Sequence, residues 1–151
     1  MATAPSFEKS IDQLNSFLRG ELSAVETYQQ ALAKVQEQEV ISRLRECLQS
    51  HQQRVQLLRQ RVVQLGGIPS TDSGAWGVFA KLVEGSAAVL GDKAAISALE
   101  EGEDRGLRDY KTGLDDLDAD SRRIIEQQVL PAEQETHRTM STLKHSLQQR
   151  M

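Results

Sequence analysis

With 151 residues, a formal net charge of −4 and interspersed acidic and basic side chains, the chain suits one domain with a single core and has no basic surface for nucleic acid. Three prolines, ten glycines and 4% aromatic residues, beside abundant Leu, Gln, Glu and Ala, favour helix over sheet. No apolar run can span a bilayer, the N-terminus lacks a signal-peptide pattern, and the single cysteine, Cys47, cannot form an internal disulfide, so we expect a cytoplasmic protein without membrane or nucleic-acid partners.

Two apolar seams predict helices over residues 7–35 and 38–65. Their members recur in alternating steps of three and four residues, which is typical of helices packed about 20° from antiparallel. Because only residues 36–38 separate the seams, the two helices are expected to form a tight antiparallel hairpin. The seams contain Ile11, Leu14, Leu18, Glu21, Val25, Tyr28, Leu32 and Val35, then Ile41, Leu44, Leu48, His51, Val55, Leu58, Val62 and Leu65.

A long connection, residues 66–91, separates this hairpin from a second one. Within it, an amphipathic stripe predicts a short helix over about residues 75–90 that lies against the side of the bundle. Two further helices are predicted over 92–117 and 120–148. A connection of this length can return the chain along the bundle, so the second and third helices are expected to run parallel.

Five ionisable side chains interrupt the apolar seams: Glu21, His51, Glu103, Glu133 and His137. A buried carboxylate or imidazole costs several kcal/mol unless it is paired, hydrogen-bonded or bound to metal. Glu21 and His51 are equidistant from the first turn at position 36, and Glu103 and His137 are equidistant from a second turn expected at position 120. Each pair is therefore predicted to place a carboxylate beside an imidazole.

The two hairpins also share a glutamate followed by a tyrosine. Glu21 precedes Tyr28 by seven residues, and Glu103 precedes Tyr110 by seven. Together with the inward histidines and the segment ELSAVETYQQAL, these residues resemble the ferritin-like superfamily. The chain is similar to rubrerythrin-type and bacterioferritin-type bundles, and more so to small bacterial bundles classed as a domain of unknown function. The resemblance implies one ferritin-like four-helix-bundle domain over residues 1–151, iron chemistry and a stress-related role.

The sequence departs from the di-iron pattern of that superfamily. Di-iron members carry Glu-x-x-His on the second and fourth helices. Here Leu48 and Gln134 stand three residues before the two inward histidines, and neither side chain can bridge two metals. The remaining candidate ligands are Glu21, His51, Glu103, His137 and Glu133, with Tyr28 and Tyr110 as hydrogen-bond donors behind them.

Two interpretations of this reduced set stay open. In the first, it forms a degenerate iron or zinc site, because both metals accept imidazole and carboxylate ligands. An active form of such a site would be an iron-dependent oxidase or a peroxide-reactive centre. In the second, the same side chains form a buried polar network without metal in a non-catalytic structural or interaction bundle. The mixed-charge outer faces are compatible with a homodimer in either case.

Overall fold

The computed structural model describes residues 7–74 and 91–149, which form a bundle of long helices. The described residues contain no strand, and the predicted all-α four-helix bundle is confirmed. The predicted short helix over about residues 75–90 lies outside the described residues. The elements are α1 (Glu8–Leu32), α2 (Gln38–Gln64), α4 (Asp92–Thr112), and a fourth helix built from α5 (Ala119–Ile124), a π-helical turn (Ile125–Val129) and α6 (Leu130–Gln149).

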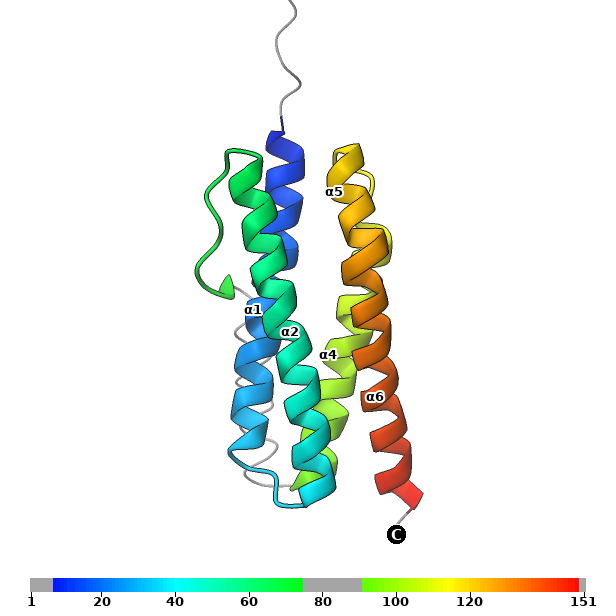
Figure 1. The fold of residues 1–151 in the computed structure, drawn as a ribbon. Helices are drawn as coiled ribbons and strands as arrows, with labels where there is room; N and C mark the ends of the chain where they lie inside the picture. Colours follow the sequence, from blue (N-terminus) through cyan, green and yellow to red (C-terminus); the bar gives the residue numbers. More distant parts are fainter. Residues whose placement is uncertain (1–6, 75–90, 150–151) are drawn as a thin grey trace, which may run out of the picture.

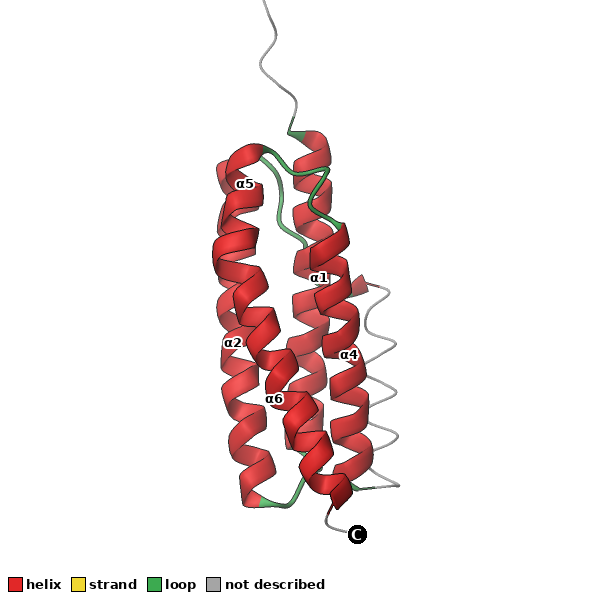
Figure 2. Cartoon of the chain, turned by 90° about the vertical axis from the view of Figure 1, so that its right-hand side faces the viewer, coloured by secondary structure: helices red, strands yellow, loops and turns green. Residues whose placement is uncertain are grey.

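Two aspartates fix the direction of the second hairpin. Asp92, the first residue of α4, accepts hydrogen bonds from the backbone N–H of Gln36 at 3.3 Å, so α4 begins beside the α1–α2 turn. At the other end of the bundle, Asp118 pairs with Arg61 of α2 at 3.0 Å and bonds Ser10 of α1. The helices α2 and α4 therefore run parallel, as the long connection predicts (Figures 1 and 2).

The turn between α4 and α5 differs from the prediction. The helix α4 ends at Thr112 instead of residue 117, and residues 113–118 connect it to α5. Asp118 then caps α5, because its carboxylate accepts a hydrogen bond from the backbone N–H of Ser121 at 3.1 Å. The turn itself thus precedes position 120, although the residues of α6 at the level of Glu103 remain those close to the predicted height.

The fourth helix contains one irregular segment. Pro131 has no N–H group and cannot complete a regular α-helical ladder. Immediately before it, the chain forms the π-helical turn Ile125–Val129, in which the N–H of Leu130 bonds the carbonyl of Ile125. The irregularity beside Pro131 is thus a π-helical turn, a feature frequently found near functional sites. Glu133 follows on the next turn.

Apolar side chains fill the bundle in two clusters, one toward each end. Cys47 belongs to the cluster near the α1–α2 turn, and burial raises the pKa of its thiol to about 12, as expected for a space-filling residue. In the described part of the chain, no helix has the length and hydrophobicity to cross a membrane. The buried members are Tyr28, Ala31, Val35, Val40, Leu44, Cys47, Ala95, Ile96, Leu99, Met140, Leu143 and Leu147 in one cluster and Leu14, Phe17, Leu18, Val55, Leu58, Val62, Tyr110, Leu117, Ile125 and Val129 in the other.

Candidate functional site in the bundle core

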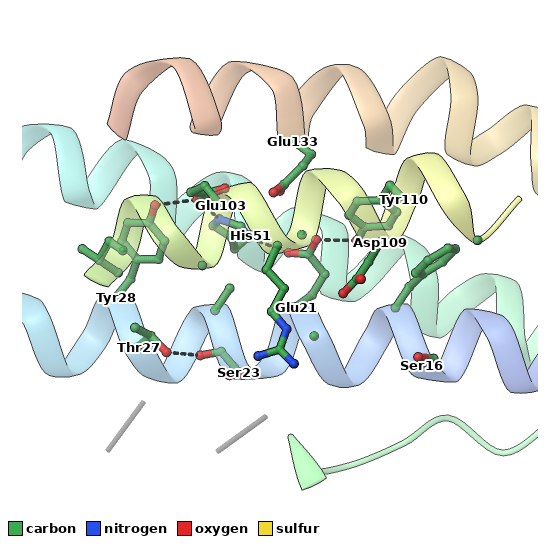
Figure 3. A pocket seen from close by; sticks show the side chains of 18 of the residues that line it. Ser16, Glu21, Ser23, Thr27, Tyr28, His51, Glu103, Asp109, Tyr110 and Glu133 are labelled. Atoms are coloured by element: carbon green, nitrogen blue, oxygen red, sulfur yellow. Dashed lines mark hydrogen bonds and ion pairs between the residues drawn. The ribbon is translucent and has the colours of Figure 1, made fainter. Parts of the chain in front are cut away.

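A layer of polar side chains crosses the bundle between the two apolar clusters. Every long helix contributes to it, and each member is 4% exposed or less. Figure 3 shows part of the layer, with Glu133 pointing from α6 toward the side chains of the other helices. The members, here named the polar layer, are Glu21 and Tyr28 of α1, His51 and Arg54 of α2, Glu103 and Tyr110 of α4, and Glu133 and Thr136 of α6.

His51 lies between two carboxylates. Its Nδ1 is 2.5 Å from Oε1 of Glu21, and its Nε2 is 2.8 Å from Oε2 of Glu103. Burial disfavours the imidazolium form, but the charges of Glu103 and Glu21 outweigh it and raise the pKa of His51. The pairing of Glu21 with His51 predicted from sequence is confirmed, and both neighbouring carboxylates favour the imidazolium form of this buried histidine.

Arg54 supplies a second buried cation. Its Nη1 donates to Oε2 of Glu21 at 3.3 Å and forms an ion pair with Oε2 of Glu133. Its Nη2 donates to Oγ1 of Thr136 at 2.9 Å. Although burial opposes the charged form, Glu21 and Glu133 raise the pKa of Arg54 above its ordinary value. Sequence reasoning missed this residue, because arginines on amphipathic helices are usually solvated.

The tyrosines link the two hairpins. Tyr28 of α1 donates its hydroxyl hydrogen to Oε2 of Glu103 at 2.6 Å, and Tyr110 of α4 donates to Glu21. Burial, followed by the charge of the bonded glutamate, raises the pKa of both hydroxyls well above the ordinary value. Both tyrosines therefore remain protonated donors, in the supporting position predicted for them.

The inward orientation predicted for His137 is wrong. Its side chain is 26% exposed, and its Nε2 contacts Asp104 on the outside of the bundle. The preceding residue, Thr136, faces the core instead and donates to Oε1 of Glu103 at 2.8 Å. Consecutive residues on an α-helix point about 100° apart, so only one of these two can face inward. The inward position predicted for Glu133 is confirmed, since that residue is fully buried.

The two sequence positions expected for bridging carboxylates, three residues before each histidine, also lie outside the polar layer. Leu48 is partly buried against the apolar cluster near the α1–α2 turn, and Gln134 is exposed. The inward i, i+3 pairs are His51 with Arg54 on α2 and Glu133 with Thr136 on α6. The inward pairs are therefore displaced from the positions compared with Glu-x-x-His in the sequence, by three residues on α2 and by one residue on α6.

The polar-layer residues of the first hairpin (α1 and α2) and of the second hairpin (α4 and α6) are related by constant spacings in the sequence. Arg54 follows Glu21 by 33 residues and bonds it, and Thr136 follows Glu103 by 33 residues and bonds it. A shift of 82 residues moves each member of the first hairpin onto one of the second: Glu21 onto Glu103, Tyr28 onto Tyr110, His51 onto Glu133, and Arg54 onto Thr136. This offset was the signal in the sequence that identifies Arg54 and Thr136.

The charges of the polar layer are balanced. Burial opposes ionisation of both Glu21 and Glu103, but the nearby cations Arg54 and His51 lower the pKa of each, that of Glu103 to about 2. For Glu133, burial and then the charges of Glu103 and Glu21 raise the pKa well above the ordinary value. The two glutamates with lowered pKa values, Glu21 and Glu103, thus face His51 and Arg54, whereas the protonated form is favoured at Glu133.

A cavity of about 410 Å³ lies against the polar layer. Its walls come mainly from α1 and α4, and Glu21, Glu103 and Glu133 line part of it (Figure 3). Gly106 leaves room for Glu133 on its α4 side, because a Cβ atom there would lie 2.6 Å from Oε1 of Glu133 and displace that carboxyl group. Burial raises the pKa of Asp109, another residue of this wall.

The sequence of this bundle matches a known protein family, and its fold matches a solved structure. Residues 9–116 match the family described as Domain of unknown function (DUF2383). The chain belongs to the DUF2383 family. This DUF2383 chain also resembles the crystal structure of a "ferritin like, diiron-carboxylate" protein from Bacillus anthracis str. Ames, with a TM-score of 0.66 and 16% identity over 97% of this chain and 98% of that chain. At this identity the likeness establishes the ferritin-like fold. The comparison with curated proteins gave no match.

By distance, the core of this DUF2383 protein contains a possible metal site. One ligand atom from each of Glu21, His51 and Glu133 lies within 4.8 Å of the others. However, Arg54 already bonds both of these glutamates, and both ring nitrogens of His51 are engaged by carboxylates. The three groups therefore have suitable spacing, but their donor atoms are occupied.

Proposed function

We propose that this DUF2383 protein is a non-catalytic ferritin-like bundle that acts by binding, with a metal-independent ion network in its core. The observation that carries this proposal is the position of Arg54, whose guanidinium joins Glu21 to Glu133 in the middle of the polar layer. A guanidinium keeps its charge at all ordinary pH values, so it is a permanent cation between these carboxylates.

The donor set does not fit a di-iron centre. Such a centre uses a glutamate from each of two helices and Glu-x-x-His from each of the other two. Glu21, Glu103 and Glu133 match three of these positions, but Arg54 and Thr136 stand where the two imidazoles belong. Because the two ionised glutamates are already balanced by His51 and Arg54, a divalent cation would add uncompensated positive charge to a buried site.

A binding role is supported by the cavity beside the polar layer. Its volume of about 410 Å³ is within the usual range of about 300 to 1,000 Å³ for small-molecule sites. It combines apolar walls at Phe17 and Leu99 with buried polar groups, which is the usual composition of a ligand site. The hydrogen bonds between Glu21, Glu103 and their partners hold the polar wall of this cavity together.

A second candidate function is binding of iron or zinc by Glu21, His51 and Glu133, favoured by the 4.8 Å spacing of their ligand atoms. Bound iron would supply redox chemistry with oxygen or peroxide. For the metal to enter, Arg54 must leave both glutamates and His51 must lose a proton. These two rearrangements distinguish the second candidate from the first.

Metal titration separates the two candidates. Protein prepared without a metal-affinity column is titrated with iron(II) under anaerobic conditions and, separately, with Zn²⁺. Our proposal predicts that Glu21→Gln and His51→Gln proteins bind as much of either metal as the unaltered chain. Binding of about one ion per chain that is lost in both core variants, and retained in the exposed control His145→Gln, would establish the second candidate instead.

A further inference from the structure

A second group of donor atoms lies on the outer side of α4 and α6. Glu100 and Asp104 are one turn apart on α4, and His137 of α6 lies opposite them. One ligand atom from each residue lies within 4.8 Å of the others. This spacing allows all three to bind a single ion.

The outer group is separate from the polar layer. Asp104 and His137 directly follow Glu103 and Thr136 in the sequence, so on each helix one residue faces the core and the next faces outward. Nε2 of His137 contacts Oδ1 of Asp104, which brings α4 and α6 together at this point. The group is partly exposed, with side-chain exposures of 53% for Asp104 and 26% for His137, so an ion can reach it from solvent.

The charges around the outer group differ from those in the core. The nearby cation is Lys144, whose Nζ lies 3.5 Å from Oε1 of Glu100, and Ser141 donates to Oε2 of the same carboxylate at 3.2 Å. The Lys144 side chain is 34% exposed, so it can turn toward solvent when an ion binds. No buried guanidinium occupies this group of described residues, unlike the position between Glu21 and Glu133.

We propose that Glu100, Asp104 and His137 form a surface site for a divalent transition-metal ion, with Zn²⁺ as the best match. One imidazole and two carboxylates are common zinc ligands, and a solvent-exposed site leaves the fourth tetrahedral position to water. An ion at this site joins α4 to α6. The proposal does not depend on the core network.

Calorimetric titration of the full chain with ZnCl₂ at neutral pH tests the site. We expect about one Zn²⁺ per chain, and at least about tenfold weaker binding in His137→Ala and in Asp104→Asn. The matched controls are His145→Ala, another exposed histidine of α6, and Glu101→Gln, the exposed neighbour of Glu100. Both controls should bind as the unaltered chain does. All four substitutions are at non-buried positions, and helical circular dichroism verifies that each variant is folded.

Two outcomes of the titration would overturn the proposal. In the first, the unaltered chain shows no saturable Zn²⁺ binding. In the second, His137→Ala and Asp104→Asn bind Zn²⁺ with unchanged affinity. Zn²⁺ binding that is lost in Glu21→Gln and retained in His137→Ala would assign the ion to the core, and would overturn the core proposal as well. Loss of binding only in the outer variants supports the surface site and leaves the core network in place.

Discussion

The two hairpins of the bundle carry the same polar positions but fill them differently. Each begins with a glutamate and a tyrosine seven residues later. The first hairpin then places His51 and Arg54 in the polar layer, and the second places Glu133 and Thr136 at the equivalent positions. One half therefore contributes two cations and one carboxylate, and the other contributes two carboxyl groups and a hydroxyl.

This difference is the basis of the proposed metal-independent core. In a symmetric di-iron bundle, metal ions neutralise the carboxylates of both halves. Here Arg54 and His51 of the first half neutralise Glu21 and Glu103, and the electrostatic balance is intramolecular. The comparison predicts that exchanging residues between the halves changes metal binding, stability and pH dependence.

The largest change is expected from restoring the symmetric pattern. The triple substitution His51→Glu, Arg54→His and Thr136→His gives both hairpins Glu-x-x-His at the buried positions. It removes both core cations and supplies two imidazoles, so we expect core binding of one to two iron(II) or Zn²⁺ ions per chain, detected by elemental analysis after anaerobic loading. His137→Ala is included in the variant and in its parent to remove the surface site. A variant that folds but takes up no more metal than its parent would contradict the equivalence of the two halves.

Removing the central cation alone should destabilise the protein strongly. In Arg54→Met, Glu21 loses a buried ion partner and Glu133 loses a hydrogen-bond donor, and we expect the free energy of unfolding in urea to fall by about 3–5 kcal/mol. The control Arg45→Met changes an exposed arginine of the same helix and should alter stability by less than about 0.5 kcal/mol. Equal small effects of both substitutions would show that Arg54 does not balance the buried carboxylates.

The glutamates of the two halves should respond differently to neutralisation. Glu21→Gln removes an ionised carboxylate that partners His51 and Arg54, and we expect a loss of about 2–4 kcal/mol in the free energy of unfolding. Glu133→Gln replaces a group whose raised pKa favours the protonated form, so less charge is removed and a smaller loss, below about 1.5 kcal/mol, is expected. Chemical denaturation of both variants measures the difference. A larger loss of stability in Glu133→Gln than in Glu21→Gln would contradict the lowered pKa of Glu21 and the raised pKa of Glu133.

Stability should fall on both sides of mildly acidic pH. Glu103 has an ordinary pKa of 4.5 and a folded pKa of about 2, so it contributes stability above pH 4.5 that is lost as pH falls toward 2, up to about 3 kcal/mol. His51, with its pKa raised above 6.5, contributes stability that is complete below pH 6.5 and lost as pH rises through the folded value. The raised pKa of Glu133 adds to the loss at higher pH.

Urea titrations over a range of pH values measure this profile. We expect Glu103→Gln to weaken the acid-side loss and His51→Gln to weaken the loss at higher pH. A flat profile in the unaltered protein between pH 2 and 4.5, or one unaffected by these two substitutions, would disagree with the charges assigned to the polar layer.

The smallest effect concerns one glycine in each hairpin. A Cβ atom at Gly20 meets nothing within 4 Å, so Gly20→Ala should stabilise α1 by up to about 1 kcal/mol through helix propensity. At Gly106 the same gain is offset, because the new methyl group displaces Oε1 of Glu133 from a position 2.6 Å away. Gly106→Ala is therefore expected to be neutral or destabilising by about 1 kcal/mol in thermal unfolding. Equal stabilisation by both substitutions would show that the Glu133 carboxyl group is free to move.

The sequence was sufficient for the fold because apolar periodicity and connection lengths determine it. It was also sufficient for the pairing of Glu21 with His51, since the first turn is short and its centre is clear. The height opposite Glu103 was also predictable, because Thr136 and His137 both lie at the level that the expected turn gives. The apolar pattern allows either Thr136 or His137 as the inward residue between Glu133 and Met140, and only the structure shows that it is Thr136.

Arg54 was missed for a different physical reason. Apolar periodicity and metal-binding side chains mark interior positions in the sequence, and an arginine one turn from His51 is neither apolar nor a metal ligand. The contacts with Glu21 and Glu133 show that its guanidinium is inside the bundle. The constant offset between the hairpins carries the same information, but pairing His51 with His137 instead of Glu133 obscures it.

The most direct test of the central claim is a crystal structure of the protein after anaerobic iron(II) or Zn²⁺ loading, with anomalous diffraction recorded at the edge of the added metal. Our account predicts no anomalous peak among Glu21, His51 and Glu133, with the Arg54 guanidinium still bonded to both glutamates. A strong peak at that position, with Arg54 turned out of the polar layer, would contradict it.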